Sequence, residues 1–235
     1  MHCDTNTSED SHFTAETELA APVEAWLASV GSTCIGREVE VGFGIPDLVA
    51  GVGTVRALRN RRRQAQPLTR PVELDLLEYC YTSRSADELR KWAPHGYSEL
   101  KRRTLVPLIK AGKITESQGK FRARVRPKDP FDRLIAVELK LGDIKRGISQ
   151  AYAYRAFADV SYLAVPAHRL SPEIMQRCRS VGIGLLAVHK RLVEEIVRPD
   201  AESYATPGRR RMASEHTMAA NNDSAGRIAG APRRS

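Results

Sequence analysis

Apolar residues recur first at helical spacing and then at strand spacing along the first fifty positions. Within 14–30 the large apolar residues follow one another at spacings of four, three, one and three residues, which predicts an amphipathic helix that Gly31 ends. Two short apolar segments, 37–41 and 45–50, then predict strands joined by a glycine-containing turn. The arginine-rich segment 51–70, which also contains prolines, is expected to be an irregular basic linker.

A different arrangement is predicted for residues 71–130. Three short helices are followed by a hairpin of two strands: helix 72–80, a helix that begins at Ser85, helix 97–111, and strands 113–115 and 120–125. Ser85 and Glu88 have the spacing of a capping box, which marks the start of the second helix. Three helices followed by a basic hairpin resemble a winged helix-turn-helix domain.

Apolar strands alternate with helices again after residue 130. The predicted strands are 134–140, 160–165, 184–188 and a short closing element at 192–197, and the predicted helices are 147–157 and 172–181. This order favours an α/β sandwich with a mixed sheet, formed by 14–50 and 131–198, with residues 71–130 inserted as a second domain. Such an insertion costs little, because loop-closure entropy grows only slowly with length. Residues 1–13 are expected to be flexible and residues 199–235 to form a disordered tail.

The positive charge of the chain is concentrated in its central third. The 235 residues carry a net charge of +9, yet residues 51–130 hold 19 basic and 8 acidic side chains, a net of +11, and the remainder has a net of −2. This distribution favours a polyanionic partner for the central block. A solubilising surface is the alternative.

Composition excludes several classes of protein. The apolar runs are too short for a membrane span, and the polar first ten residues do not resemble a signal peptide. The four cysteines are scattered without metal-ligand spacing, which argues against a zinc site or a disulfide framework. We therefore expect a cytoplasmic protein that does not enter the membrane.

Three charged residues lie in predicted strands that are otherwise apolar. Asp47 precedes the apolar run Leu48-Val49-Ala50, while Glu138 and Lys140 alternate with apolar neighbours and so share one face of their strand. A buried sheet tolerates charged groups only when they are paired or bind a metal. The strands pair if the insert is looped out, which predicts that the three side chains meet. The alternative is an exposed pair of Glu138 and Lys140, with Asp47 in a turn.

These residues resemble the motifs of the PD-(D/E)XK nuclease superfamily. Ile45-Pro46-Asp47 and Glu138-Leu139-Lys140 match its two central motifs, and Gln150 and Tyr154 match the Gln-x-x-x-Tyr helix of one branch. Glu18 matches a glutamate that some members place beside the metal, with Glu24 as the alternative. The 91 positions between Asp47 and Glu138 exceed the usual spacing, and the insert accounts for the difference.

The resemblance implies a restriction-endonuclease-like fold and a magnesium-dependent reaction. Asp47, Glu138 and the carbonyl of Leu139 would hold Mg²⁺, for which Mn²⁺ would substitute. Lys140 would orient or deprotonate the attacking water and balance charge in the transition state. Gln150 and Tyr154, one helical turn apart, would support the site or touch the substrate.

Sequence and resemblance together predict a DNA endonuclease, with duplex DNA as its partner and a role in restriction or repair. The expected DNA contacts are Lys101, Arg102 and Arg103 on the third helix of the insert, Arg122 and Arg124 on its hairpin, and Arg61, Arg62 and Arg63 in the linker. A DNA-binding regulator that retains the fold without activity is the alternative. An RNA-directed nuclease and a homodimer are also compatible with the sequence.

Overall fold

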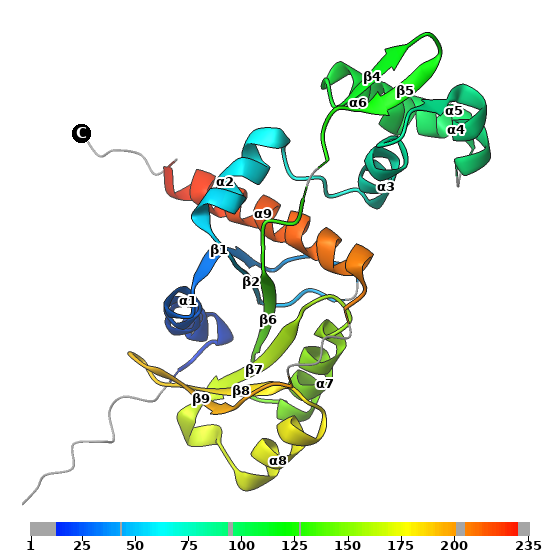
Figure 1. The fold of residues 1–235 in the computed structure, drawn as a ribbon. Coiled ribbons are helices and arrows are strands. Elements are labelled where there is room, and N and C mark those ends of the chain that lie inside the picture. Colours follow the sequence, from blue (N-terminus) through cyan, green and yellow to red (C-terminus); the bar gives the residue numbers. More distant parts are fainter. Residues whose placement is uncertain (1–12, 43, 94–95, 127, 201–204, 230–235) are drawn as a thin grey trace, which may run out of the picture. The chain divides into compact units, whose positions relative to one another are not determined.

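The computed structural model describes residues 13–42, 44–93, 96–126, 128–200 and 205–229 (Figure 1). The expected flexible segment 1–13 lies outside these residues except for Phe13. The chain divides into two compact units, one formed by residues 1–55 and 130–235 and the other by residues 56–129. The second unit is thus an insertion in the first.

The first unit is built on a mixed sheet of six strands. In order across the sheet, these are β1 (Ser32–Arg37), β2 (Leu48–Val52), β6 (Arg133–Leu139), β7 (Val160–Pro166), β8 (Gly184–Val188) and β9 (Val193–Val197). The three central strands β6, β7 and β8 are parallel to one another, and the remaining pairs are antiparallel. Strands β2 and β6 are neighbours although the whole insert separates them in sequence. The α/β class and the mixed sheet predicted from the sequence are therefore confirmed.

Helices cover both faces of this sheet (Figure 1). They are η1 (Glu16–Leu19), α1 (Ala20–Ser29), α7 (Ile144–Tyr154), η3 (Ala167–Arg169), α8 (Pro172–Ser180) and α9 (Pro207–Ala229). Helix α1 packs Val23 and Leu27 against Val137 and other alternate residues of the strands. Helices α7 and α8 bury Ile148 and Cys178 on the opposite face.

Helix α9 corrects the expectation of a disordered tail. It packs against β1 and β2, and Ala213 and Met218 are buried there. Gly36 of β1 permits this close approach: a Cβ atom at that position would lie 3.1 Å from the Cβ of Ala220 and 3.2 Å from the carbonyl oxygen of Thr217. Residues 201–204 and 230–235 of the expected tail lie outside the described part of the chain.

Other boundaries also differ from the predictions. The predicted helix 14–30 begins with the 3₁₀ turn η1 before it becomes α-helical. The predicted strand 37–41 is instead loop, because β1 ends at Arg37. The expected irregular linker contains helix α2 (Val55–Gln64).

The inserted unit contains helices and a small antiparallel sheet. Its elements after α2 are α3 (Pro71–Tyr79), β3 (Arg84–Ser85), α4 (Ala86–Trp92), α5 (Tyr97–Leu100), the π-helical turn η2 (Lys101–Leu105), α6 (Val106–Lys110), β4 (Ile114–Ser117) and β5 (Lys120–Ala123). The sheet has the order β3-β5-β4. The predicted capping box is present, since Ser85 and Glu88 bond reciprocally to each other's backbone N–H groups.

Candidate active site

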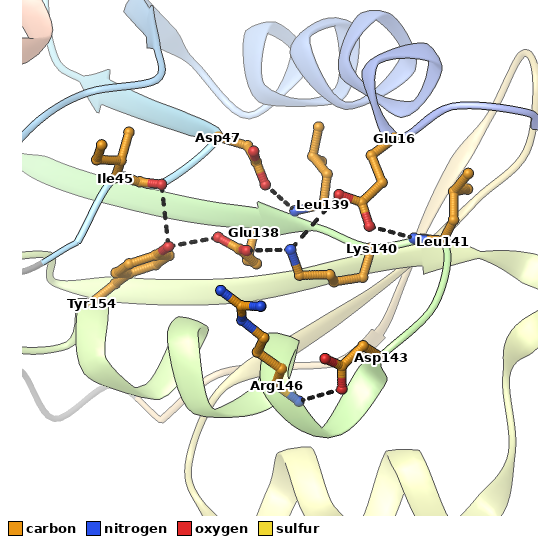
Figure 2. A network of polar contacts seen from close by, with 10 residues as sticks. All are labelled: Glu16, Ile45, Asp47, Glu138, Leu139, Lys140, Leu141, Asp143, Arg146 and Tyr154. Atoms are coloured by element: carbon orange, nitrogen blue, oxygen red, sulfur yellow. Dashed lines mark hydrogen bonds and ion pairs between the residues drawn. The ribbon is translucent and has the colours of Figure 1, made fainter.

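The pairing of β2 with β6 brings Asp47 and Glu138 together. Leu48 pairs with Val137, so the residue before Leu48 lies opposite the residue after Val137. The backbone N–H of Leu139 donates to Asp47 Oδ2 across 2.7 Å (Figure 2). Two carboxylates that are 91 positions apart in sequence thus meet at one end of two neighbouring strands.

Lys140 joins these carboxylates at the end of β6. Its Nζ lies 2.7 Å from Glu138 Oε1 and 3.7 Å from Glu16 Oε2. The side chain of Glu138 is only 2 % exposed, which excludes the alternative of an exposed surface pair. A charge so deeply buried is stable only with close partners, and Lys140 is one of them.

Helix α7 supplies the second partner of Glu138. The hydroxyl of Tyr154 donates to Glu138 Oε2 across 2.6 Å and lies 3.4 Å from the carbonyl oxygen of Ile45. Gln150, one turn earlier on the helix, hydrogen bonds to the Tyr154 hydroxyl. The Oε1 atom of Gln150 is buried without a hydrogen-bond partner in the described part of the chain. Both predicted helix residues therefore lie at the site.

The third carboxylate at the site is Glu16, not the predicted Glu18 or its alternative Glu24. Glu16 belongs to η1 and accepts a hydrogen bond of 3.2 Å from the backbone N–H of Leu141. Glu18 instead accepts hydrogen bonds from the N–H and hydroxyl of Thr14. Glu24 forms a two-pronged ion pair with Arg37. Glu16 lies three and seven residues before the buried Leu19 and Val23, so helical spacing would have placed it on the face that packs against the sheet.

The electrostatics of the site reflect burial and crowding of negative charge. Burial raises the pKa of Asp47 to about 6, the charge of Glu138 adds to the rise, and the Leu139 N–H opposes it. Burial alone would lower the pKa of Lys140, but the hydrogen bond and charge of Glu138 outweigh it and the net shift is upward. Burial and the neighbouring Glu138 also raise the pKa of Tyr154. At neutral pH, Lys140 is therefore an ammonium and Tyr154 a neutral hydrogen-bond donor.

The donor chemistry fits a hard divalent cation. Oδ1 of Asp47 has no hydrogen-bond partner among the described residues, and a bound cation would offset the burial and the charge of Glu138 that raise the pKa of this carboxyl. No group of three or more His, Cys, Asp or Glu side chains within the described residues is arranged to hold a metal. Asp47 and Glu138 would therefore need a further oxygen donor, such as the Leu139 carbonyl.

The DNA contacts predicted for the third helix and the hairpin of the insert are all exposed to solvent. Lys101, Arg102 and Arg103 are exposed on η2, as are Arg122 and Arg124 on or beside β5. Arg102 forms a 3.0 Å ion pair with Glu99, to which Arg103 is also paired.

The three arginines of α2 are not equivalent. Arg62 and Arg63 are exposed, but Arg61 is only 2 % exposed and donates to the carbonyl of Ala65. Arg61 is therefore buried and turned away from solvent, while Arg62 and Arg63 are exposed to it.

Comparison with known proteins finds no matching family model, no matching curated protein and no matching solved structure. Within the part of the chain that the structure describes, no helix has the length and apolar character needed to cross a membrane.

Proposed function

We propose that this chain is a magnesium-dependent nuclease of the PD-(D/E)XK type that hydrolyses phosphodiester bonds in DNA. The observation that carries the proposal is the convergence of Asp47, Glu138 and Lys140 at the ends of two paired strands. Paired carboxylates beside an ammonium suit phosphoryl chemistry, because the transition state carries negative charge that nearby cations stabilise.

Each side chain has a distinct part in the proposed reaction. Asp47 and Glu138 would hold Mg²⁺, or Mn²⁺ in its place, together with the Leu139 carbonyl. When bound, the ion supplies Lewis-acid activation of the phosphate and of the attacking water. Lys140 would stabilise the negative charge of the transition state, because its raised pKa keeps it protonated.

Helix α7 would keep Glu138 in a fixed orientation. The Tyr154 hydroxyl and the Lys140 ammonium each occupy a different oxygen of the Glu138 carboxylate. Such second contacts restrict rotation of a metal-binding carboxylate and tune its affinity. Gln150 supports Tyr154 from the preceding turn.

The inserted unit would bind duplex DNA as a winged helix-turn-helix. Three helical segments followed by the β4–β5 hairpin, with exposed basic side chains on both, support this assignment. Lys101, Arg102 and Arg103 would contact phosphates or bases, and Arg122 and Arg124 would contact the backbone. Arg62 and Arg63 would add phosphate contacts, whereas the buried Arg61 would not.

Incubation of the purified full chain with plasmid and labelled oligonucleotides tests the proposal. We expect cleavage of duplex DNA with Mg²⁺ or Mn²⁺ and none with EDTA. Asp47→Asn, Glu138→Gln and Lys140→Met should each reduce cleavage at least ~100-fold while duplex affinity stays within about twofold.

One exposed acidic residue and one exposed basic residue serve as matched controls for the acidic and basic residues of the site. Asp132→Asn, at the start of the segment that leads into β6, and Lys145→Met, on α7, should leave cleavage unchanged. Duplex binding without cleavage under any metal condition would favour a non-catalytic regulator. Cleavage of RNA in preference to DNA would overturn the assignment of substrate.

A further inference from the structure

The first turn of α7 lies directly against Lys140. Gly147 makes this approach possible, because a Cβ atom there would lie 2.7 Å from Lys140 Cγ and 2.8 Å from Leu163 Cδ1. Asp143 caps the helix by accepting a 3.3 Å hydrogen bond from the backbone N–H of Arg146. The start of α7 is thus fixed beside the candidate active site.

Arg146 belongs to the helix face that already serves this site. Arg146, Gln150 and Tyr154 follow one another at steps of four residues, so they lie along one side of α7. Figure 2 shows the Arg146 side chain extending from the helix toward Glu138 and Lys140. Two members of this row contact the Glu138 network, and Arg146 occupies the position nearest the start of the helix.

The Arg146 guanidinium is available to a ligand. The residue is exposed, and its side chain makes no hydrogen bond or ion pair with any residue that the structure describes. Lys140 is paired with Glu138 and Glu16 and also feels the charge of Asp47, so a phosphate approaching this one ammonium meets an excess of negative charge. A second cation at the edge of the site would offset that repulsion.

We propose that Arg146 binds a backbone phosphate of the strand that is cleaved, and so positions the scissile bond beside Asp47, Glu138 and Lys140. A guanidinium suits this task, because its planar N–H groups pair with two phosphate oxygens at once. This assignment rests on the proposed nuclease function and adds a substrate contact from the nuclease unit itself, separate from the basic residues of the insert.

The test compares Arg146→Gln and Arg146→Lys with Lys145→Gln in the full chain. Lys145 is the adjacent exposed cation on α7, and its replacement removes the same charge. Two quantities are measured with a short duplex oligonucleotide: kcat/KM for cleavage in Mg²⁺, and the dependence of duplex affinity on salt in Ca²⁺.

For Arg146→Gln we expect kcat/KM to fall about 10- to 100-fold, as for a lost charge-assisted hydrogen bond. The slope of log affinity against log salt should decrease in magnitude by about one, since one phosphate contact is lost. Arg146→Lys should retain the slope but recover only part of kcat/KM, because the ammonium lacks the planar fork. Lys145→Gln should change neither quantity.

The two proposals fail in different ways. If the wild type cleaves and Arg146→Gln matches Lys145→Gln in both measurements, the Arg146 assignment is wrong and the nuclease proposal stands. If the wild type binds duplex without cleaving it, the nuclease proposal is wrong, and the salt slope still decides whether Arg146 contacts phosphate. A wild type that neither binds nor cleaves overturns both.

Discussion

Tyr154 donates a 2.6 Å hydrogen bond to Glu138 and thereby connects helix α7 to the end of strand β6. Both side chains are almost completely buried, with exposed fractions of 1 % for Tyr154 and 2 % for Glu138. A carboxylate in this position depends on its partners, because burial without them would be costly. The bond therefore stabilises the buried carboxylate and, in the proposed nuclease, would also fix its orientation.

Replacement of Tyr154 by Phe separates this hydrogen bond from the packing of the ring. We expect Tyr154→Phe to lower the free energy of unfolding by about 1–3 kcal/mol, because Glu138 loses one of its buried partners. Cleavage should fall about tenfold as the carboxylate gains freedom. Tyr152→Phe makes the same chemical change at a side chain that is 55 % exposed and should alter neither quantity. Urea unfolding and cleavage rates measure both, and equal behaviour of the two variants would argue against the assigned role of Tyr154.

The raised pKa of Asp47 predicts a pH-dependent effect of Asp47→Asn in the absence of metal. Because the folded state raises this pKa from 3.8 to about 6, wild type loses stability as pH rises through the window between these values. Asn cannot titrate, yet its side-chain oxygen can still accept the hydrogen bond from Leu139. In EDTA, the free energy of unfolding of the variant relative to that of wild type should increase between pH 4 and pH 7. The increase should be about 1 kcal/mol once solvent screening is taken into account.

Denaturant unfolding at several pH values measures this difference. Addition of Mg²⁺ at pH 7 should stabilise wild type more than the variant, since a bound cation compensates the carboxylate charge. A stability difference that does not change with pH would contradict the environment assigned to Asp47.

The central part of the site could be predicted from sequence because it depends on regular structure. Alternation along a strand places Glu138 and Lys140 on one face, and hairpin pairing of the flanking strands places Asp47 opposite Glu138 despite the insertion. The capping box at Ser85 depends only on local spacing and was predicted for the same reason.

Two features of the structure were not predicted from the sequence. The resemblance, rather than helical spacing, assigned Glu18 to the site, whereas the structure brings Glu16 there. Helix α9 buries Ala213, Ser214 and Thr217 against β1, and small residues of this kind give no strong apolar period. The close approach of Thr217 and Ala220 depends on Gly36, which is far away in sequence, so no local pattern reveals it.

Glu99→Gln tests the proposed DNA contacts of the insert, because it is expected to increase the affinity for duplex DNA. Glu99 pairs with both Arg102 and Arg103, so its neutralisation should release two cations toward phosphate. We expect duplex affinity at low salt to rise about 2- to 10-fold and the salt dependence to steepen. Lys101→Gln should have the opposite effect on both the affinity and its salt dependence.

The matched control is Glu173→Gln, which removes the acidic partner of Arg177 on α8. Fluorescence anisotropy across a salt series provides the measurement, and unchanged affinity for Glu99→Gln would remove η2 from the proposed interface.

Arg210 provides the sharpest test of the packed C-terminal helix. Its guanidinium bonds to both carboxylate oxygens of Asp159 at 2.9 Å and to the carbonyl of Phe131 at 3.1 Å, while Asp159 also accepts from the backbone N–H of Leu134. These contacts connect α9 to the segments that lead into β6 and β7. The pair is mostly buried, with exposed fractions of 18 % and 21 %, so removal of one partner leaves a poorly solvated charge.

Arg210→Met should therefore reduce the free energy of unfolding by about 2–4 kcal/mol. Arg191→Met, at an exposed residue between β8 and β9, should have an effect below about 0.5 kcal/mol. Because the interaction is direct, Arg210→Met combined with Asp159→Asn should cost less than the sum of the single changes. Urea unfolding of the four proteins in this cycle gives the coupling energy. A disordered tail would show no coupling and no difference between Arg210→Met and Arg191→Met, whereas a packed α9 requires both.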